Sequence, residues 1–310
     1  MMWPDIPFEE WKETGNALHM WLQIAGKFRM AQTPWINHSW QAAFYVTARG
    51  LTSGLIPSSQ GVSYSIDFDF IDQAAVIHAS MGQSAHIALK AQSVADFHSA
   101  FLAALADLGA PTQMHGAPNE VADAIPFAQQ TTPVAYDAQA AKRFWEALVQ
   151  VDRVFSTFRT SYLGKVSPVH LFWGSLDLAV TRFSGRPAPM HPGGIPNLPD
   201  DVTQEAYSHE VSSAGFWAGG GGIDHAAFYS YAYPTPAGFS DAPLSHPDAY
   251  FHSDLGEFIL PYDSVRDAQD PDAVLLTFLS ETYEAAATTG AWPRDGLECA
   301  VGKPGRVRSL

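Results

Sequence analysis

The sequence contains the same succession of secondary-structure patterns twice, and this repetition limits the folds that the chain can adopt. A helical pattern over residues 8–30 precedes several strand patterns and a second helix. A helical pattern that starts at Asp137 again precedes strands and a last helix. Strands that follow one another without an intervening helix pair antiparallel, because parallel neighbours need a long crossover. The order predicts an α+β fold of two similar halves, each an antiparallel sheet of about four strands flanked by helices.

The joint between helix and first strand is also alike in the two halves. Residues 33–50 read TPWINHSWQAAFYVTARG and residues 167–185 read SPVHLFWGSLDLAVTRFSG. Each has Ser/Thr-Pro, an aromatic stretch with a histidine, and an ending with Thr, Arg and Gly. We interpret each joint as one long strand, at residues 37–48 and 169–183, and the likeness as an internal duplication.

Connecting segments predict the domain boundaries. The first α+β half covers residues 1–130 and the second covers 131–292, with a Pro/Gly-rich insertion at 186–207. A loose tail is expected at 293–310. Two halves related in this way place a cleft between them, and clefts between domains are common ligand sites.

Composition excludes several classes of protein. Hydrophobic residues make up 46% of the 310 residues and charged residues 16%, which is typical of a folded chain rather than a disordered one. The net charge of −15 repels phosphate groups, so neither nucleic acid nor an anionic membrane is an expected partner. The same charge also serves solubility, which is the simpler interpretation.

A cytoplasmic location is expected. Cys299 is the single cysteine, so no disulfide forms within one chain and no thiolate cluster holds a metal. The N-terminal residues lack the basic and apolar regions of a signal peptide, and no apolar run is long enough to span a bilayer.

Polar groups concentrate among aromatic residues in four segments. These are NHSW (37–40), VHLFWGSLD (169–177), YSHEVSSAGFW (207–217) and FHSDLGE (251–257). The third runs into AGGGG (218–222), which lacks the pattern of a phosphate-binding loop and predicts a sharp turn or a close approach of backbone to a ligand.

These segments supply a candidate metal site. His170, His209 and Glu210 combine imidazole and carboxylate ligands, which suit Zn or Fe. No HExxH or similar spacing supports the set. Buried histidines that hydrogen-bond within the core are the alternative, because buried polar groups usually find partners.

The same segments supply candidate catalytic residues. His38 and His170 lie at corresponding positions of the two joints, on the apolar faces of the predicted strands. Asp177 is a candidate general base, and Arg182, predicted to share a face with His170, is a candidate clamp for an anionic substrate group. Arg182 pairing with one of the many carboxylates is the alternative. The candidate binding residues are aromatic: Trp40, Trp173, Trp217 and Tyr231.

Three strings are long and unusual enough to carry a resemblance. TPWINHSW, SPVHLFWGSLDLAVTRFSGR and EAYSHEVSSAGFWAGGGG resemble a family of bacterial proteins of about 300 residues that is classed as a domain of unknown function. The resemblance covers about residues 3–292. It implies a bacterial, cytosolic chain and carries over no activity, cofactor or catalytic residue.

Two functions therefore stand as hypotheses. The first is an enzyme that acts on a small molecule in the cleft between the halves, with or without a metal. The second is a non-catalytic protein whose aromatic pocket binds a small ligand. A third class, a structural or interaction module, is expected if the histidines are scattered and packed.

Overall fold

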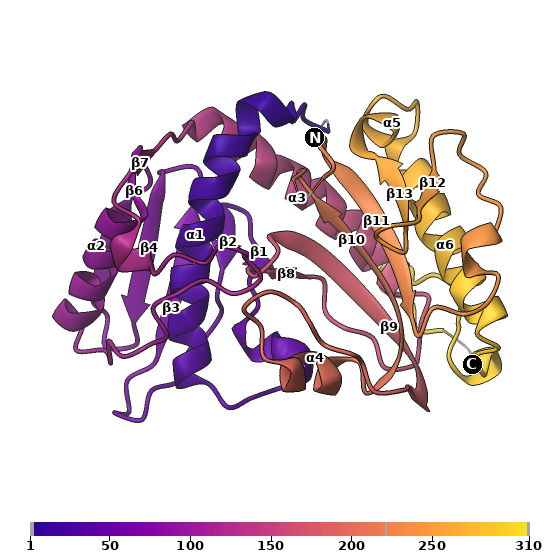
Figure 1. The fold of residues 1–310 in the computed structure, drawn as a ribbon, viewed down its shortest axis with the longest axis horizontal. Helices are drawn as coiled ribbons and strands as arrows, with labels where there is room; N and C mark the ends of the chain where they lie inside the picture. Colours follow the sequence, from indigo (N-terminus) through magenta and orange to yellow (C-terminus); the bar gives the residue numbers. More distant parts are fainter. Residues whose placement is uncertain (1–2, 221, 309–310) are drawn as a thin grey trace.

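Two antiparallel sheets form the framework of the protein, one in each half (Figure 1). The computed structural model describes residues 3–220 and 222–308. The five-stranded sheet has the order β1-β2-β3-β4-β5, and the six-stranded sheet has the order β12-β13-β11-β10-β9-β8. The predicted α+β class is confirmed.

The first half contains two helices and the five-stranded meander. Its elements are α1 (Phe8–Gln32), η1 (Asn37–Ala42), β1 (Tyr45–Val46), β2 (Gly50–Thr52), β3 (Tyr64–Asp69), β4 (Ala74–Ala79), β5 (Ser84–Ala88), β6 (Gln92–Ser93), α2 (Val94–Asp107), η2 (Phe127–Gln129) and β7 (Pro133–Val134). A capping box begins α2, since the Ser93 side chain accepts from Asp96 N and Asp96 accepts from Ser93 N. Helices α1 and α2 meet through Trp21 and Phe97, whose rings stack 5.0 Å apart.

The second half has the same order of helix, sheet and helix. Its elements are α3 (Ala138–Arg159), β8 (His170–Phe172), β9 (Asp177–Pro187), α4 (Asp200–Ala206), β10 (His209–Trp217), β11 (Ala227–Tyr233), η3 (Phe239–Asp241), β12 (Tyr250–His252), β13 (Glu257–Pro261), α5 (Tyr262–Arg266), α6 (Pro271–Thr289) and η4 (Arg294–Gly296). Asp137 and Asp270 cap α3 and α6 through their side chains.

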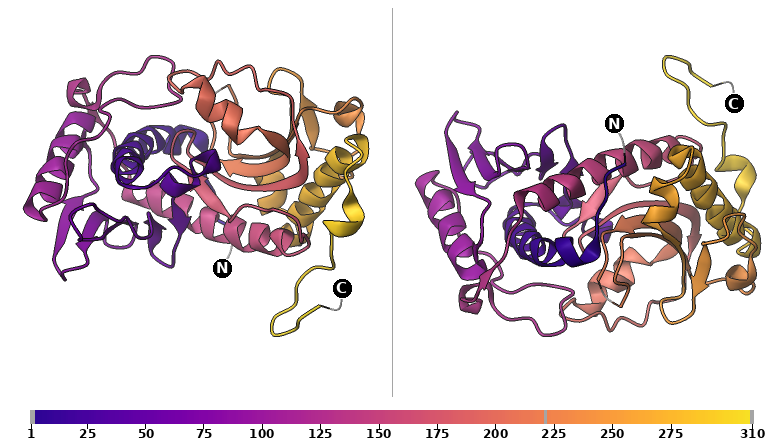
Figure 2. Two further views of the ribbon diagram at one scale, coloured as in Figure 1. Left: turned by 90° about the horizontal axis from the view of Figure 1, so that it is seen from below. Right: turned by 90° about the horizontal axis from the view of Figure 1, so that it is seen from above.

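The long helices of the second half cover one face of the six-stranded sheet. Helix α3 contacts β9, and α6 contacts β10 and β11. Leu178, Phe216 and Phe228 alternate with residues of the opposite face and are fully buried. Helix α3 also contacts α1 and β1, so it runs along both halves, as Figure 2 shows. The opposite face of the sheet is not covered by α3 or α6.

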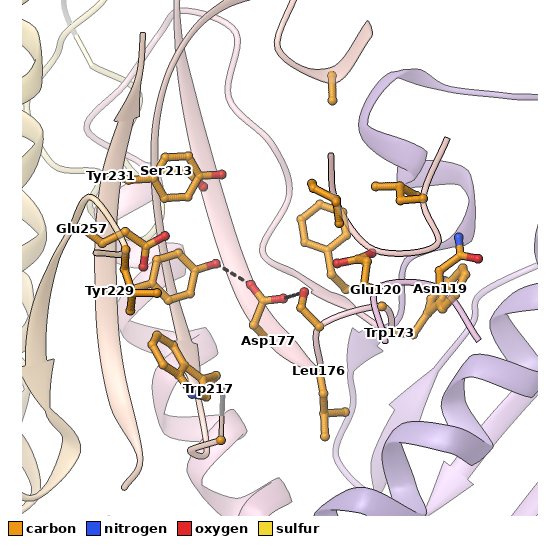
Figure 3. A pocket seen from close by; sticks show the side chains of 18 of the residues that line it. Asn119, Glu120, Trp173, Leu176, Asp177, Ser213, Trp217, Tyr229, Tyr231 and Glu257 are labelled. Atoms are coloured by element: carbon orange, nitrogen blue, oxygen red, sulfur yellow. Dashed lines mark hydrogen bonds between the residues drawn. The ribbon is translucent and has the colours of Figure 1, made fainter. Parts of the chain in front are cut away.

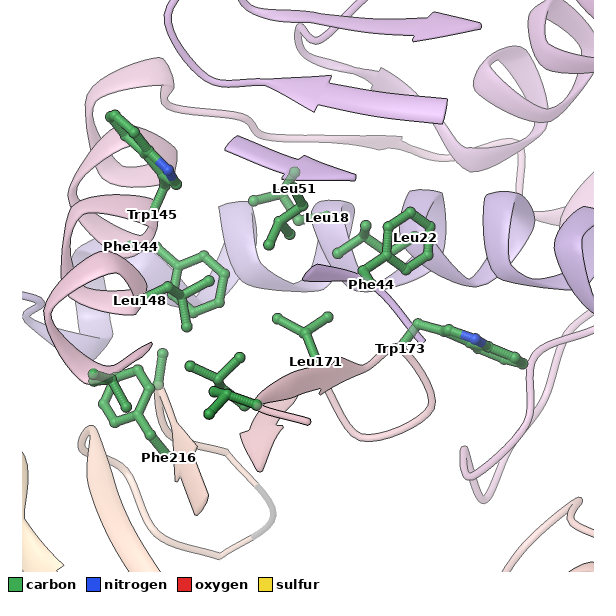
Figure 4. Close-up of a cluster of buried hydrophobic side chains, with 14 of the residues drawn as sticks. Leu18, Leu22, Phe44, Leu51, Phe144, Trp145, Leu148, Leu171, Trp173 and Phe216 are labelled. Atoms are coloured by element: carbon green, nitrogen blue, oxygen red, sulfur yellow. The ribbon is translucent and has the colours of Figure 1, made fainter. Parts of the chain in front are cut away.

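The two sheets meet at their first strands. Phe44 and Leu171 exchange two backbone hydrogen bonds, of 3.0 Å from Phe44 N and 2.8 Å from Leu171 N. Both side chains are fully buried, and Figure 4 shows them inside one cluster with residues of α1 and α3. A single hydrophobic core therefore runs through both predicted halves.

The strand predicted at residues 37–48 is wrong over most of its length. Residues Asn37–Ala42 form a 3₁₀ helix in which His38 and Ser39 have positive φ angles of 64° and 54°. Side chains take the backbone carbonyls that a neighbouring strand would use: Trp173 Nε1 donates to Ala42 O, and Arg29 donates to Ala43 O. Only Tyr45–Val46 remains a strand.

The strand predicted at 169–183 is a hairpin. Strands β8 and β9 are joined by a turn over residues 173–176, and His170 pairs with Ala179. Directly paired residues share a face of a sheet and neighbours in sequence alternate, so Arg182 lies on the opposite face from His170. The prediction that His170 and Arg182 share a face is wrong, because the turn between β8 and β9 interrupts the alternation of faces that a continuous strand would have.

The predicted insertion and the predicted tail both contain ordered structure. The insertion at 186–207 contains the end of β9 and helix α4. In the tail, Cys299 N donates to Ser161 O at 3.1 Å and Arg308 donates to Thr160 O at 2.6 Å. Positions 309 and 310 of the predicted tail, and Gly221 of AGGGG, lie outside the described residues. Within the described part of the chain, no helix is both long and apolar enough to cross a membrane.

Candidate functional site

A cavity of about 880 Å³ lies against the face of the six-stranded sheet that α3 and α6 leave uncovered. Both halves line it, through residues between 8 and 120 and between 172 and 257. Helices α1 and α4 and the segment 191–198 complete its walls. Its volume suits a small organic molecule.

Side chains at alternate positions of the strands form the floor of the cavity. The residues that face it come from every second position: Asp177 and Thr181 of β9, Ser213 and Trp217 of β10, Tyr229, Tyr231 and Tyr233 of β11, and Glu257 of β13. Figure 3 shows the side chains of β10, β11 and β13 on one side of Asp177 and Glu120 on the other. The floor is thus both aromatic and acidic.

Asp177 is held from two sides. Ser175 Oγ donates to its Oδ1 at 2.5 Å, and the Tyr229 hydroxyl donates to its Oδ2 (Figure 3). Tyr229 reaches across β10 because its partner there is Gly215, where a Cβ atom would overlap the tyrosine ring. Burial raises the pKa of Asp177, and the two hydrogen bonds act against that rise.

Glu257 lies at the start of β13, and in Figure 3 the Tyr229 side chain lies between it and Asp177. Its side chain is half-buried, and burial together with the negative charge of Asp177 raises its pKa to about 7. An acid with this pKa exchanges protons readily near neutral pH.

Glu120 enters from the opposite wall, on the irregular segment between α2 and η2. Its side chain is accessible from the cavity, yet the surrounding protein raises its pKa to about 7, an effect that Asp177 strengthens and Lys27 opposes. The carboxylate packs over Gly174, where a Cβ atom would overlap it. The position of the Glu120 carboxylate therefore requires glycine at residue 174.

Helix α1 anchors the segment that carries Glu120. Lys27 donates to Asn119 Oδ1, and Asn119 N donates to Gln23 Oε1 at 2.9 Å. Lys27 is only 4% exposed, and burial lowers its pKa to about 8. Gln23 and Lys27 of α1 therefore face the protein interior.

Three histidines also line the cavity: His19, His38 and His191. Burial lowers the pKa of each, that of His38 to about 3, with Lys165 and His170 contributing there. His38 stacks on Trp40 at 4.9 Å, and its Nε2 has no hydrogen-bond partner among the described residues. All three rings are neutral at pH 7.

Of the residues proposed from the sequence, five line the cavity. They are His38, Asp177, Trp173, Trp217 and Tyr231. Trp40 lies behind His38 and does not line the cavity. His170 is fully buried, with Nδ1 2.8 Å from Pro168 O, in keeping with a core histidine.

The proposed metal set of His170, His209 and Glu210 is wrong. His170 pairs with Ala179, which pairs with Gly215, and Glu210 lies five residues further along β10. That separation is about 16 Å at the usual rise of a strand. Among residues 3–220 and 222–308, no three His, Cys, Asp or Glu side chains gather to hold a metal, so Zn or Fe has no ligand set there.

Two further proposed residues have structural partners instead. Glu210 accepts from Arg186 Nη2 at 2.7 Å and from Ser184 Oγ at 2.6 Å. Arg182 is 2% exposed, lies 3.6 Å from the Phe158 ring centroid, and donates to Phe158 O. Arg182 faces α3 and α6 rather than the cavity, so the proposal that it holds a substrate anion there is wrong.

Sequence reasoning missed both acids with a pKa near 7. Glu257 ends the segment FHSDLGE, which was singled out for its polar groups, so a signal for it existed. Glu120 lies in a polar connection without periodicity, and no sequence signal marks it.

The fold and the cavity define an antiparallel α+β protein with an acidic, aromatic pocket between its halves. The model of a family of unknown function, DUF5996, matches residues 3–299, and the chain belongs to that family. The expected resemblance to a domain of unknown function of about 300 residues is thereby confirmed. No curated protein and no solved structure matches the chain.

Proposed function

We propose that this protein is an enzyme that acts on a small molecule in the cavity and uses carboxyl groups for general acid–base catalysis. The observation that carries the proposal is the pair Glu120 and Glu257, which enter from opposite walls, each with a pKa of about 7. Strongly shifted acids in a cavity are typical of catalytic sites, and an acid is most effective when its pKa is near the working pH.

Asp177 has a different role in this proposal. Ser175 and Tyr229 fix both of its oxygens, so it binds and orients the substrate between the two exchanging acids. Trp173, Trp217 and Tyr231 supply the apolar contacts, and His38 contributes a neutral imidazole. No step requires a metal.

A non-catalytic binding protein is the second candidate. The observation that favours it is the aromatic lining by Trp173, Trp217 and Tyr231, which supports affinity without turnover. In either case the net charge of −15 supports a small molecule rather than nucleic acid or an anionic membrane as partner. A cytoplasmic location is part of the proposal.

The test is a search for consumed compounds. Wild-type protein and the variants Glu120→Gln and Glu257→Gln are incubated with a metabolite extract that is then followed by mass spectrometry. We expect a compound that the wild type consumes and the variants consume about 100-fold more slowly or worse. Glu13→Gln is the matched control, because Glu13 is exposed and does not line the cavity.

Two outcomes contradict the proposal. If the wild type retains compounds on the protein without changing any of them, the binding protein is the correct function. If a compound is consumed equally by the wild type and both variants, the acid–base assignment is wrong.

A further inference from the structure

The protein offsets the charge of the cavity only in part, through Lys27, which donates to Asn119 and lowers the pKa of Glu120 without forming an ion pair with it. Glu120, Asp177 and Glu257 line it, and none of them forms an ion pair with a residue of the described ranges. The lysine in the lining is Lys12, which pairs with Glu9 at 2.5 Å. Asp177 is buried, Glu257 is half-buried and Glu120 is exposed towards the cavity, and among the side chains that the structure describes none of them has the paired cation that usually accompanies a buried acid.

The other titratable groups that face the cavity do not supply this cation. His19 of α1, His38 of η1 and His191 of the insertion all have a lowered pKa and are uncharged at neutral pH. The hydroxyls of Tyr229 and Tyr231 have a raised pKa and stay protonated. Glu120, Asp177 and Glu257 therefore supply the negative charge of the cavity, and that charge increases with pH because the pKa of both glutamates is about 7.

The aromatic wall beside these acids has the composition that favours organic cations. The Trp217 and Tyr229 rings lie 5.7 Å apart, and Tyr229 stacks on Tyr231 at 6.1 Å. The negatively polarised faces of such rings attract ammonium groups, and the attraction increases when water is excluded. Tyr207 continues the wall, with its hydroxyl 2.7 Å from that of Tyr231.

An independent feature indicates that a ligand also makes hydrogen bonds here. Thr203 of α4 lines the cavity and is 2% exposed, yet its Oγ1 has no partner in the described part of the chain. His38 Nε2 is likewise without a partner there, and η1 and α4 are in contact. Buried polar atoms are rarely left without a partner, so a hydrogen-bonding group of a ligand fits at this wall.

We propose that the molecule bound in this cavity is an organic cation, an amine or quaternary ammonium compound. Its charged nitrogen lies between Asp177, Glu257 and the rings of Trp217 and Tyr229, and a polar group elsewhere on it bonds to Thr203 or His38. This inference rests on the proposed function only in taking the cavity as the substrate site. It excludes the anionic substrate expected from Arg182.

Binding measurements with pairs of compounds test the charge directly. The probes are choline and benzyltrimethylammonium, each compared with the neutral compound in which carbon replaces nitrogen and with a carboxylate of similar size. Isothermal titration calorimetry should show each cation binding at least about tenfold more tightly than its neutral counterpart, with the carboxylate weakest. Equal affinity for cation and neutral compound, tighter binding of the carboxylate, or no binding of either cation would overturn the inference.

Variants of the acidic residues test which carboxyl group binds the charged nitrogen. Asp177→Asn should reduce the affinity for the cations about tenfold and leave the neutral compounds unaffected. Asp254→Asn, an exposed acid outside the lining, is the matched control. If Asp177→Asn does not fold, Glu257→Gln replaces it, and unchanged cation affinity in the folded variant contradicts the proposal.

A pH series gives a second measurement on the unaltered protein. Protons compete with a cation for the carboxyl groups, so affinity should rise as pH increases from 6 to 8, by at most about tenfold per pH unit for each proton displaced. A flat profile contradicts the inference. The two proposals can be contradicted separately. If the protein binds the cations but consumes no compound, the proposal that it is an enzyme is wrong. If it consumes a neutral or anionic compound, the proposal that its ligand is an organic cation is wrong.

Discussion

In the folded chain the pKa of Glu257 is about 7, compared with 4.5 for the free side chain. The folded state therefore holds a proton that the unfolded state has released at intermediate pH. Stability from this group is fully present below about pH 4.5 and is lost as pH rises through 7. Glu257→Gln removes the penalty, so the variant should be roughly 1–2 kcal/mol more stable than the wild type at pH 8, allowing for water in the cavity.

Urea unfolding at pH 5 and pH 8 measures this effect. The difference between Glu257→Gln and the wild type should be small at pH 5 and several-fold larger at pH 8. Glu13→Gln, at an exposed position of α1, should behave alike at both pH values. A stabilisation of equal size at pH 5 means that lost packing or hydrogen bonding, rather than ionisation, determines the effect.

Residue types alone predicted part of the site. Asp177 and Trp217 were predicted because they lie in segments where polar groups concentrate among aromatic residues, and Tyr231 was predicted as an aromatic binding residue; such composition is readable from sequence. His170 and Arg182 were misassigned because face assignments in a strand depend on continuity, and a four-residue turn interrupts it. Glu120 was missed because only tertiary contacts, with Gly174 and α1, bring it to the cavity.

At the scale of elements, two irregular segments hold each other over the cavity. Glu120 N donates to Pro196 O at 2.9 Å, and Asn197 Nδ2 donates to Val121 O at 2.6 Å. Asn197→Ala removes the side-chain bond, which is worth about 1 kcal/mol in a typical protein. We expect faster amide hydrogen exchange in residues 115–125 and in 191–198, with β3 and β4 unchanged.

The comparison for this variant is Gln60→Ala, which alters an exposed amide side chain far along the chain from either segment. It should leave exchange in both segments unaffected. If Asn197→Ala also leaves it unaffected, the backbone bond from Glu120 alone is enough to hold the wall. Uniformly faster exchange throughout the molecule indicates general destabilisation instead.

Several elements follow from strong local signals. The alternation in 62–70, the capping box at Ser93 and the aspartate caps of α3 and α6 each determine an element from nearby residues. The 3₁₀ helix η1 was not predicted, because its causes are distant: the side chains of Arg29 and Trp173 occupy the carbonyls of Ala43 and Ala42. Local sequence propensity carries no information about hydrogen-bond partners that are distant in the sequence.

For the whole molecule, the predicted internal duplication has a partial counterpart in the topology. Each half has the order helix, sheet, helix, and one antiparallel bridge joins Phe44, just before β1, to Leu171 of β8, an arrangement that twofold symmetry produces. The sheets differ, because β12 is added outside β13 in the second half. Descent from a duplication remains a prediction.

The bridge between Phe44 and Leu171 also leads to a prediction about how the molecule unfolds. Phe44 and Leu171 are fully buried where the sheets meet, within a core shared by both halves, so neither half buries its apolar surface alone. Phe44→Ala should destabilise the whole protein by about 3–5 kcal/mol. Tryptophans in both halves and the backbone should report one transition, so urea curves from fluorescence and circular dichroism should shift together by the same denaturant concentration. If the two curves separate, or if the variant leaves a stable portion corresponding to residues 131–292, the halves are independent domains, and the cavity between them is held by a weaker contact than the shared core indicates.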